Sequence, residues 1–295
     1  MYSALVSQPE GPACILRGVH CRSQTLPWRG LLLGLLCVGA GCARTFVPPQ
    51  TVRAASPLPP VSSATPRVPA TILSAHFALN NAPPLRGLDA LPVVFSVELD
   101  PSTVVAEHFI ISRGDGLRSR PKEALLSPAN EGDENRTVLL VGDFGAPDDR
   151  PPTHVSVSGA LYSEEGQALR GLAAPVAAFE VAPTVVYAEV LQPGEGRCEG
   201  ARAMVRTYWS EGLRGLSPAA LERVAVHTES GERLHPTRFD DQASPGSDAA
   251  EDNVLDVCMG AAGRPVRLQI EAGILTDPAA HPNAEVDVDV ALGRG

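Results

Sequence analysis

The sequence predicts an all-β fold, and three features of its composition and patterning support this. Proline and glycine are abundant, with 28 and 27 residues, which disfavours long helices and favours short strands joined by turns. After residue 70, apolar runs rich in Val, Ile and Phe alternate with clusters of turn residues. The clearest run is EVDVDV, where Val286, Val288 and Val290 alternate with aspartates, as in a strand with one buried and one solvated face.

The predicted strands form two sets, in residues 71–182 and 183–295, and each segment has the length of one domain. The strands expected in the first segment are Ile72–Leu79, Val93–Val97, Phe109–Ser112, Val138–Val141 and Val155–Val157. Those expected in the second segment are Val185–Val190, Ala203–Tyr208, Val224–Thr228, Val254–Cys258, Val266–Ile270 and Val286–Val290. A single helix of about two turns is expected where Ser217 precedes Pro218, because serine caps helices and proline suits their first position.

The two sets of strands match each other in order, which indicates an internal repeat of about 110 residues. VFSVELDPSTV, from Val94, runs parallel to MVRTYWSEGLRGLSP, from Met204. ENRTVLLV then corresponds to EDNVLDVC, each after an acidic loop, and THVSVSGAL corresponds to VRLQIEAGIL.

A strand followed by LDPSTV, and then by a second strand, FII, that ends in a DG turn, resembles the bacterial Ig-like domains of S-layer and cell-surface proteins. The resemblance covers residues 71–182 and, more faintly, residues 183–295. It implies two tandem Ig-like β-sandwiches with Greek-key connections, placed after a signal segment and a proline-rich linker. Because this fold has many unrelated functions, the resemblance does not specify an activity.

Residues 1–41 have the composition of a signal peptide. Arg17, Arg22 and Arg29 precede an apolar run, Leu31–Ala40, which is followed by small residues. The run is too short to span about 30 Å of hydrocarbon, which needs about 20 residues. The alternative, a core helix of the mature protein, is disfavoured by two glycines within the run and by the proline-rich segment after it.

The segment Gly39–Cys42 resembles the lipobox of bacterial lipoproteins. The resemblance implies that the Cys42 thiol receives a diacylglyceryl group, that the preceding peptide is removed, and that the new amino terminus is acylated. Gly39 stands where the family usually has leucine, and Cys37, the rival acceptor, follows a bulky leucine. Several acyl chains hold a protein on a membrane firmly. Ala43 is not the aspartate that marks inner-membrane retention, so the resemblance implies the outer membrane rather than the inner one.

Residues 42–70 are expected to form the linker. Seven prolines and no acidic residue lie between Phe46 and Ala70. Such a segment favours extended polyproline II, at about 3.1 Å per residue, and would hold the folded part away from a surface. The alternative is a plain disordered tail.

Charge and cysteine usage exclude some functions. The formal net charge is −10, so nucleic-acid binding is not expected. Cys198 and Cys258 lie 60 residues apart, and in an exported protein such a pair predicts a disulfide worth about 4 kcal/mol. The alternative is two reduced, buried thiols. The pair lacks C-x-x-C spacing, so redox catalysis is not expected.

No motif marks a catalytic, cofactor or metal site. The seven histidines are scattered singly, the acidic clusters lack the spacing of a calcium loop, and there is no G-x-S-x-G. GEGRCEG, at 194–200, lacks the spacing of a phosphate-binding loop. The binding residues are unknown. Tyr208 and Trp209 either form part of an exposed binding face or belong to the core.

These observations predict a membrane-tethered, non-catalytic envelope lipoprotein, periplasmic or surface-exposed, with a lipid anchor in the membrane. It would bind an envelope protein or polysaccharide, or act as a spacer. One alternative is a hydrolase built on a β-scaffold. Another is a structural subunit of an envelope assembly, for which a long, exposed, apolar edge strand would be the sign.

Overall fold

The computed structural model describes residues 68–79, 87–126, 134–194, 197–240 and 253–293. The predicted signal peptide, Cys42 and the linker up to residue 67 lie outside the described residues. Residues Ala64–Gly295 form one compact unit. Among the described residues there is no helix of the length and hydrophobicity that a membrane span requires.

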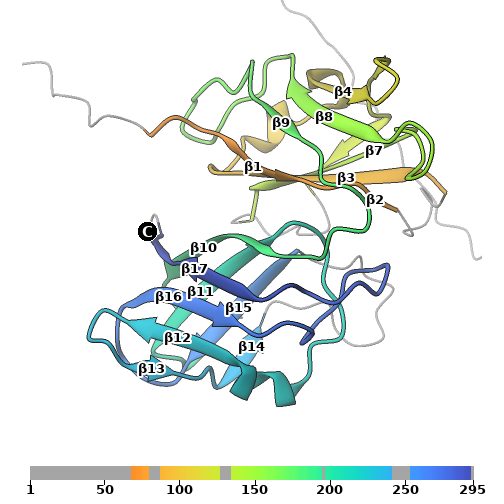
Figure 1. The fold of residues 1–295 in the computed structure, drawn as a ribbon. Coiled ribbons are helices and arrows are strands. Elements are labelled where there is room, and N and C mark those ends of the chain that lie inside the picture. Colours follow the sequence, from red (N-terminus) through yellow and green to blue (C-terminus); the bar gives the residue numbers. More distant parts are fainter. Residues whose placement is uncertain (1–67, 80–86, 127–133, 195–196, 241–252, 294–295) are drawn as a thin grey trace, which may run out of the picture. The chain divides into compact units, whose positions relative to one another are not determined.

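The first half of this unit, called the first repeat, consists of two antiparallel sheets (Figure 1). Its strands are β1 (Ile72–Ala75), β2 (Ala78–Leu79), β3 (Asp89–Phe95), β4 (Phe109–Arg113), β5 (Arg118–Ser119), β6 (Glu123–Leu125), β7 (Thr137–Gly142), β8 (Pro152–Val157) and β9 (Ala173–Pro175). One sheet has the order β1-β3-β7-β6, with β2 also paired to β3, and the other has the order β5-β4-β8-β9.

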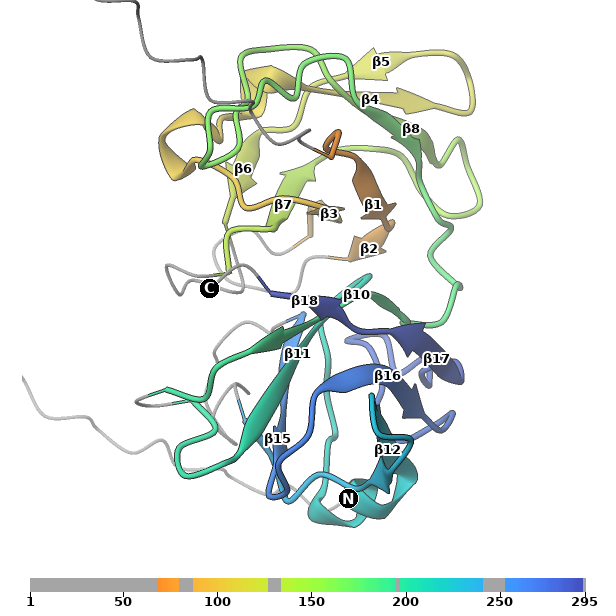
Figure 2. The same cartoon turned by 90° about the vertical axis from the view of Figure 1, so that its left-hand side faces the viewer.

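The second half, called the second repeat, has the same strand order, and most of its strands are labelled in Figure 2. Its strands are β10 (Val185–Leu191), β11 (Ala203–Trp209), β12 (Val224–Thr228), β13 (Arg233–Leu234), β14 (Arg238–Asp240), β15 (Val254–Met259), β16 (Pro265–Ile270), β17 (Val286–Asp289) and β18 (Ala291–Leu292). Its sheets are β14-β15-β11-β10-β18 and β13-β12-β16-β17. When β10 is matched to β1, strands β10 to β17 follow the order of the first repeat, without a counterpart of β2.

The predicted all-β fold class is confirmed, and each repeat is sandwich-like, with a hydrophobic core of its own. In the first repeat, Val93 and Phe95 of β3 lie in the same core as Ile111 of β4 and Val155 of β8, all fully buried. In the second repeat the core contains Trp209 of β11. Strand β4 and the second half of β8 bury alternate side chains, as the period-two pattern predicts, whereas β3 and β11 are buried on both faces.

The two repeats agree in local detail. The pairing of β1 with β3 shifts register between Ile72 and Ser74, and the pairing of β10 with β11 shifts at the corresponding place, between Val185 and Tyr187. In each repeat a segment near the end runs parallel to the first strand, through the bridge of His76 to Ala177 in one and through β18 and β10 in the other.

The register also tests the predicted repeat alignment. Thr137 pairs with Val94, and Val254 pairs with Tyr208, so ENRTVLLV does correspond to EDNVLDVC. The start at Met204 was wrong, because the position equivalent to Val94 is Tyr208. Met204 lies near the start of β11, whereas Val94 lies near the end of β3, and both strands are buried along nearly their whole length, so burial does not distinguish one register from another.

Short 3-10 turns connect the two sheets of each repeat. They are η1 (Pro101–Thr103), η2 (Ala106–His108) and η3 (Pro218–Arg223). The helix predicted at Ser217 and Pro218 is therefore a 3-10 helix, and the Ser217 side chain makes no capping hydrogen bond. In the first repeat, the Asp100 carboxylate does cap η1, accepting from the Ser102 amide at 3.0 Å.

Candidate functional site

Strands β11 and β15 of the second repeat are buried over their whole length. Their inward side chains, such as Val205 and Leu255, belong to the core of the second repeat. Their outward side chains would face water in an ordinary two-layer sandwich. Here they are covered as well, so this outer face is the candidate functional site.

The outer face, called the docking face, consists of three rows of side chains on β10, β11 and β15. Residues directly opposite each other on neighbouring antiparallel strands share a face, which defines the rows. The rows are Tyr187, Tyr208 and Val254; Glu189, Arg206 and Asp256; and Leu191, Met204 and Cys258. A charged row thus lies between two largely apolar rows.

The first row contacts the first repeat. Val94 of β3 forms one buried cluster with Tyr208 and Val254, and Leu73 of β1 packs against it. Beside this cluster, the Asn253 side-chain amide donates to the Thr137 hydroxyl of the first repeat at 2.9 Å. The two repeats therefore share a small apolar core with a direct hydrogen bond at its edge.

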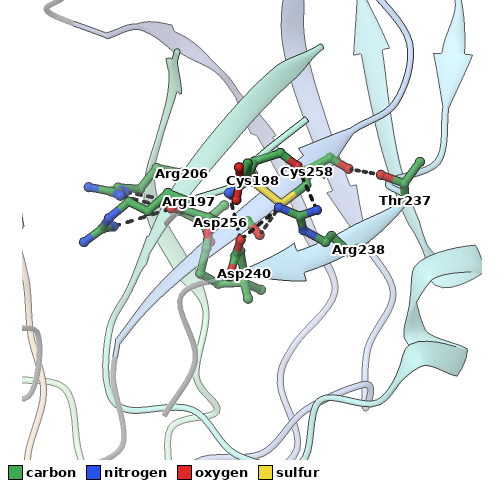
Figure 3. The surroundings of a disulfide bond; sticks show 11 residues. Arg197, Cys198, Arg206, Thr237, Arg238, Asp240, Asp256 and Cys258 are labelled. Carbon is green, nitrogen blue, oxygen red and sulfur yellow. Dashed lines mark hydrogen bonds and ion pairs between the residues drawn. A yellow bond between two sulfur atoms is a disulfide. The ribbon is translucent and has the colours of Figure 1, made fainter. Parts of the chain in front are cut away.

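The side chains of the charged row form ion pairs with one another and with the first repeat. The Arg206 guanidinium donates to both carboxylate oxygens of Asp256, at 2.9 and 3.0 Å, and both side chains are fully buried. Its Nη2 also lies 3.4 Å from Glu134 Oε1 of the first repeat. Arg197 contacts the same two carboxylates, with its Nη1 3.5 Å from Asp256 Oδ2. Figure 3 shows Arg197 and Arg206 extending alongside Asp256.

Arg136 of the first repeat connects the charged row to the first row, which contains Tyr187 and Tyr208. Its Nε lies 2.8 Å from Glu98 Oε1, and its Nη2 lies 3.4 Å from Glu189 Oε2. The guanidinium carbon lies 4.8 Å from the ring centre of Tyr187 and 5.4 Å from that of Tyr208. Stacking of this kind stabilises a cation that has lost water.

These charged groups, called the charged junction, contain four carboxyls and three guanidiniums. Its members are Glu98, Glu134, Arg136, Glu189, Arg197, Arg206 and Asp256. Burial raises the pKa of the Glu98 carboxyl to about 7, against the opposing effect of Arg136. Glu98 is therefore partly protonated near neutral pH, which reduces the excess of negative charge.

A second polar cluster joins the repeats elsewhere. His76 Nε2 of the first repeat lies 3.2 Å from Glu211 Oε1 of the second, and both side chains are buried. Burial lowers the pKa of His76 to about 4 and raises that of Glu211 to about 9, so both groups are uncharged near neutral pH. Nearby, Asp277 Oδ2 accepts from His281 Nδ1 at 2.7 Å, and the Phe179 ring packs edge-on against His281.

The predicted cysteine pair is joined in the structure by a disulfide between Cys198 and Cys258 (Figure 3). The Cys198 amide donates to Asp240 Oδ2 at 2.7 Å. Cys198, Asp240 and Cys258 are also the only group of potential metal ligands found close together among the described residues. Because the two sulfurs are bonded to each other, this group is explained by the disulfide.

Three other histidines that were candidates for metal ligands lie apart from the docking face. His108, His227 and His235 bond to the Thr103 carbonyl, the Gln269 amide and the Val224 carbonyl, respectively. His20 lies outside the described residues, as does most of the acidic loop after Asp240.

Tyr208 and Trp209 are both fully buried, so the hypothesis that they form an exposed binding face is wrong. Trp209 lies in the core of the second repeat, where its Nε1 donates to the Thr207 hydroxyl at 2.9 Å. Tyr208, its neighbour, points to the opposite side and lies on the docking face.

The comparisons with known proteins give no family. No protein-family model matches this chain, and no curated protein matches it. Among solved structures, the chain is similar to the N-terminal part of the bacterial S-layer protein SbsC, at 13% identity and a TM-score of 0.28, over 76% of this chain and 44% of that one. The S-layer protein rSbsC(31-844) matches at 13% identity and a TM-score of 0.28, over 77% of this chain and 26% of that one. The chain spans less than half the length of either. Likeness at this level carries no argument about fold or function.

Removing one member of the Arg206–Asp256 pair should destabilise the protein more than removing both. Arg206→Leu leaves the buried Asp256 carboxylate without its bidentate partner, so we expect a loss of about 3–5 kcal/mol in the free energy of unfolding, measured in urea. The double variant, with Asp256→Leu added, should recover most of this loss. A double variant less stable than Arg206→Leu would contradict the assignment of these residues as a pair.

The raised pKa of Glu98 should make the protein less stable as pH rises. Because the folded-state pKa is about 7 and the ordinary value is 4.5, the stabilising contribution is complete below pH 4.5 and is lost as pH rises to about 7. We therefore expect the melting temperature to fall less between about pH 5 and about pH 8 in Glu98→Gln than in the wild type.

The control for this measurement is Glu229→Gln, since Glu229 is exposed and forms a surface pair with Arg264. It should keep the pH dependence of the wild type. Identical pH profiles for the Glu98 variant and the wild type would show that Glu98 does not titrate as described.

Proposed function

We propose that this protein is a membrane-tethered, non-catalytic envelope lipoprotein, anchored through Cys42, in which two Ig-like sandwiches act together as a rigid spacer or binding module. The observation that carries the proposal is the docking face, which is covered by the first repeat instead of by water. Domains joined only by a linker usually move relative to each other. A buried, charged contact between the repeats opposes such movement.

The Ig-like assignment is supported by strand order. In Ig-type sandwiches, strands A, B, E and D form one sheet, and strands C, F and G form the other. With β1 as strand A, the order β1-β3-β7-β6 corresponds to A-B-E-D. The order β5-β4-β8-β9 then corresponds to C′-C-F-G. The second repeat gives the same correspondence.

A spacer requires a fixed geometry, which the charged junction can supply. Buried ion pairs contribute little net stability compared with apolar packing, but they tolerate few arrangements because every charge needs its partner. The Arg206 guanidinium satisfies carboxylates from both repeats, since Asp256 lies on β15 and Glu134 lies in the first repeat. A changed angle between the repeats would break these pairs.

The alternative function, a structural subunit of an envelope assembly, calls for a long exposed edge strand. The described sheets have none. Their edge strands have two to four residues each: β1, β5, β6, β9, β13, β14, β17 and β18. Short edges are a common way in which proteins avoid pairing with other chains. The proposed function therefore does not use strand addition.

Replacement of Cys42 tests the proposed anchor. In the producing cell, the wild-type chain should begin at an acylated Cys42 and partition into the detergent phase of a Triton X-114 extract. Cys42→Ser should lack the lipid mass and remain in the aqueous phase, since a single attachment residue carries the acyl chains. Both properties are measured by intact mass and immunoblotting.

Cys37→Ser is the matched control, because Cys37 lies in the same segment and should be removed with the signal peptide. It should behave as the wild type. A Cys42→Ser protein that still partitions into detergent, with an unmodified mass, would refute the anchor.

A further inference from the structure

The disulfide lies at the edge of the docking face, in its third row. Cys258 is on β15, and the bonded Cys198 lies in the connection between β10 and β11. The two buried sulfurs pack with Met204 of the same row, and Leu191 and Ala201 cover them. The disulfide thus holds this connection against the outer side of the sheet.

The residue before Cys198 belongs to the charged junction. Arg197 contacts Glu134 of the first repeat, and its Nη1 lies 3.5 Å from Asp256 Oδ2. Asp256 is two residues from Cys258 on β15, so both side chains lie on the same face of the sheet. One covalent bond therefore places Arg197 over the carboxylates that it neutralises.

Several local contacts position Arg197 once the disulfide has formed. The Cys198 backbone has a φ of 48°, in the left-handed region, and its amide donates to Asp240 on β14. The Ala201 amide donates to the Cys198 carbonyl at 2.9 Å, which makes a tight turn. An L-residue other than glycine pays conformational energy in the left-handed region, so this turn needs support from elsewhere.

From this arrangement we infer that the Cys198–Cys258 disulfide is a redox-sensitive latch, which keeps Arg197 in the charged junction while it is closed and releases the first repeat from the docking face when it is reduced. The inference goes beyond the proposed function and does not depend on the lipid anchor.

The charge balance explains why release would follow. With Arg197 in place, four carboxyls face three guanidiniums. Without it, the same carboxyls face only Arg136 and Arg206, and the excess of negative charge grows by one unit. Glu134 would keep Arg206 as a partner but lose Arg197. Like charges in a buried site repel strongly, and exposure to water relieves this repulsion.

The chemical step is a thiol–disulfide exchange with a dithiol reductant. A reductant thiolate attacks one sulfur of the disulfide, forming a mixed disulfide and releasing the other protein sulfur as a thiolate. The second reductant thiol then displaces the remaining protein sulfur. Two electrons pass to the protein, the reductant becomes its own disulfide, and each cysteine thiolate takes a proton at a pH below its pKa.

Tyr208 and Trp209 provide the readout, because these neighbours point to opposite sides of β11. Tyr208 lies on the docking face and Trp209 in the core of the second repeat, and both are fully buried. Hydroxyl-radical footprinting with residue-level mass spectrometry measures the exposure of each. Two samples of the full mature chain are labelled. In one the disulfide is intact, and the other has been reduced with dithiothreitol, which is then removed under anaerobic conditions.

We expect reduction to increase the labelling of Tyr208 by about tenfold, because a buried contact between charges is lost. Trp209 should stay protected. Unchanged labelling of Tyr208 would show that the disulfide does not control docking. Increased labelling of both residues would show that it maintains the fold of the second repeat instead, which also overturns the latch.

Two variants with the disulfide intact complete the test. Arg197→Ala should expose Tyr208 as reduction does, because it removes the guanidinium that the disulfide holds in the charged junction. Arg238→Ala is the matched control. Arg238 lies beside the disulfide, but it donates to the Glu199 carbonyl and to Asp240, which are both in the second repeat. Protection of Tyr208 in Arg197→Ala, or its exposure in Arg238→Ala, would overturn the inference.

Discussion

The pairing of Arg206 with Asp256 is the interaction on which the arrangement of the two repeats depends. Both side chains are fully buried on the outer face of a sheet that would otherwise meet water. Removing two such charges from water costs several kcal/mol per ion unless their partners are well placed. The face therefore needs a cover that supplies further charge in the right position, and Glu134 of the first repeat supplies it.

The two apolar rows of the docking face shield the charged row between them from water. Tyr208 and Val254 pack with Val94 of the first repeat, and the disulfide closes the other side over Met204. Both apolar rows keep water from the charged row, which strengthens its ion pairs and increases the penalty for leaving any of them unpaired. A contact of this kind fixes orientation more than it adds stability, and fixed orientation is what a spacer or a presented binding surface requires.

The sequence could predict the strands and their repetition but not the docking face. Inward positions of a strand show as alternating apolar residues, whereas outward charges such as Glu189 and Arg206 look the same whether water or another domain covers them. One signal was present: the outward residues of β11 are large, whereas β17 presents the short, solvated Asp287 and Asp289. Strands of two or three residues, such as β5 and β13, have no period to detect. The predicted strand Ile72–Leu79 is divided between β1 and β2.

Differential scanning calorimetry of the mature chain tests most directly the claim that the two repeats form one body. If the docking face is a shared core, both repeats should unfold in one transition, with a calorimetric enthalpy equal to the van't Hoff enthalpy. Two transitions at different temperatures, each with the enthalpy of a single repeat, would contradict this account.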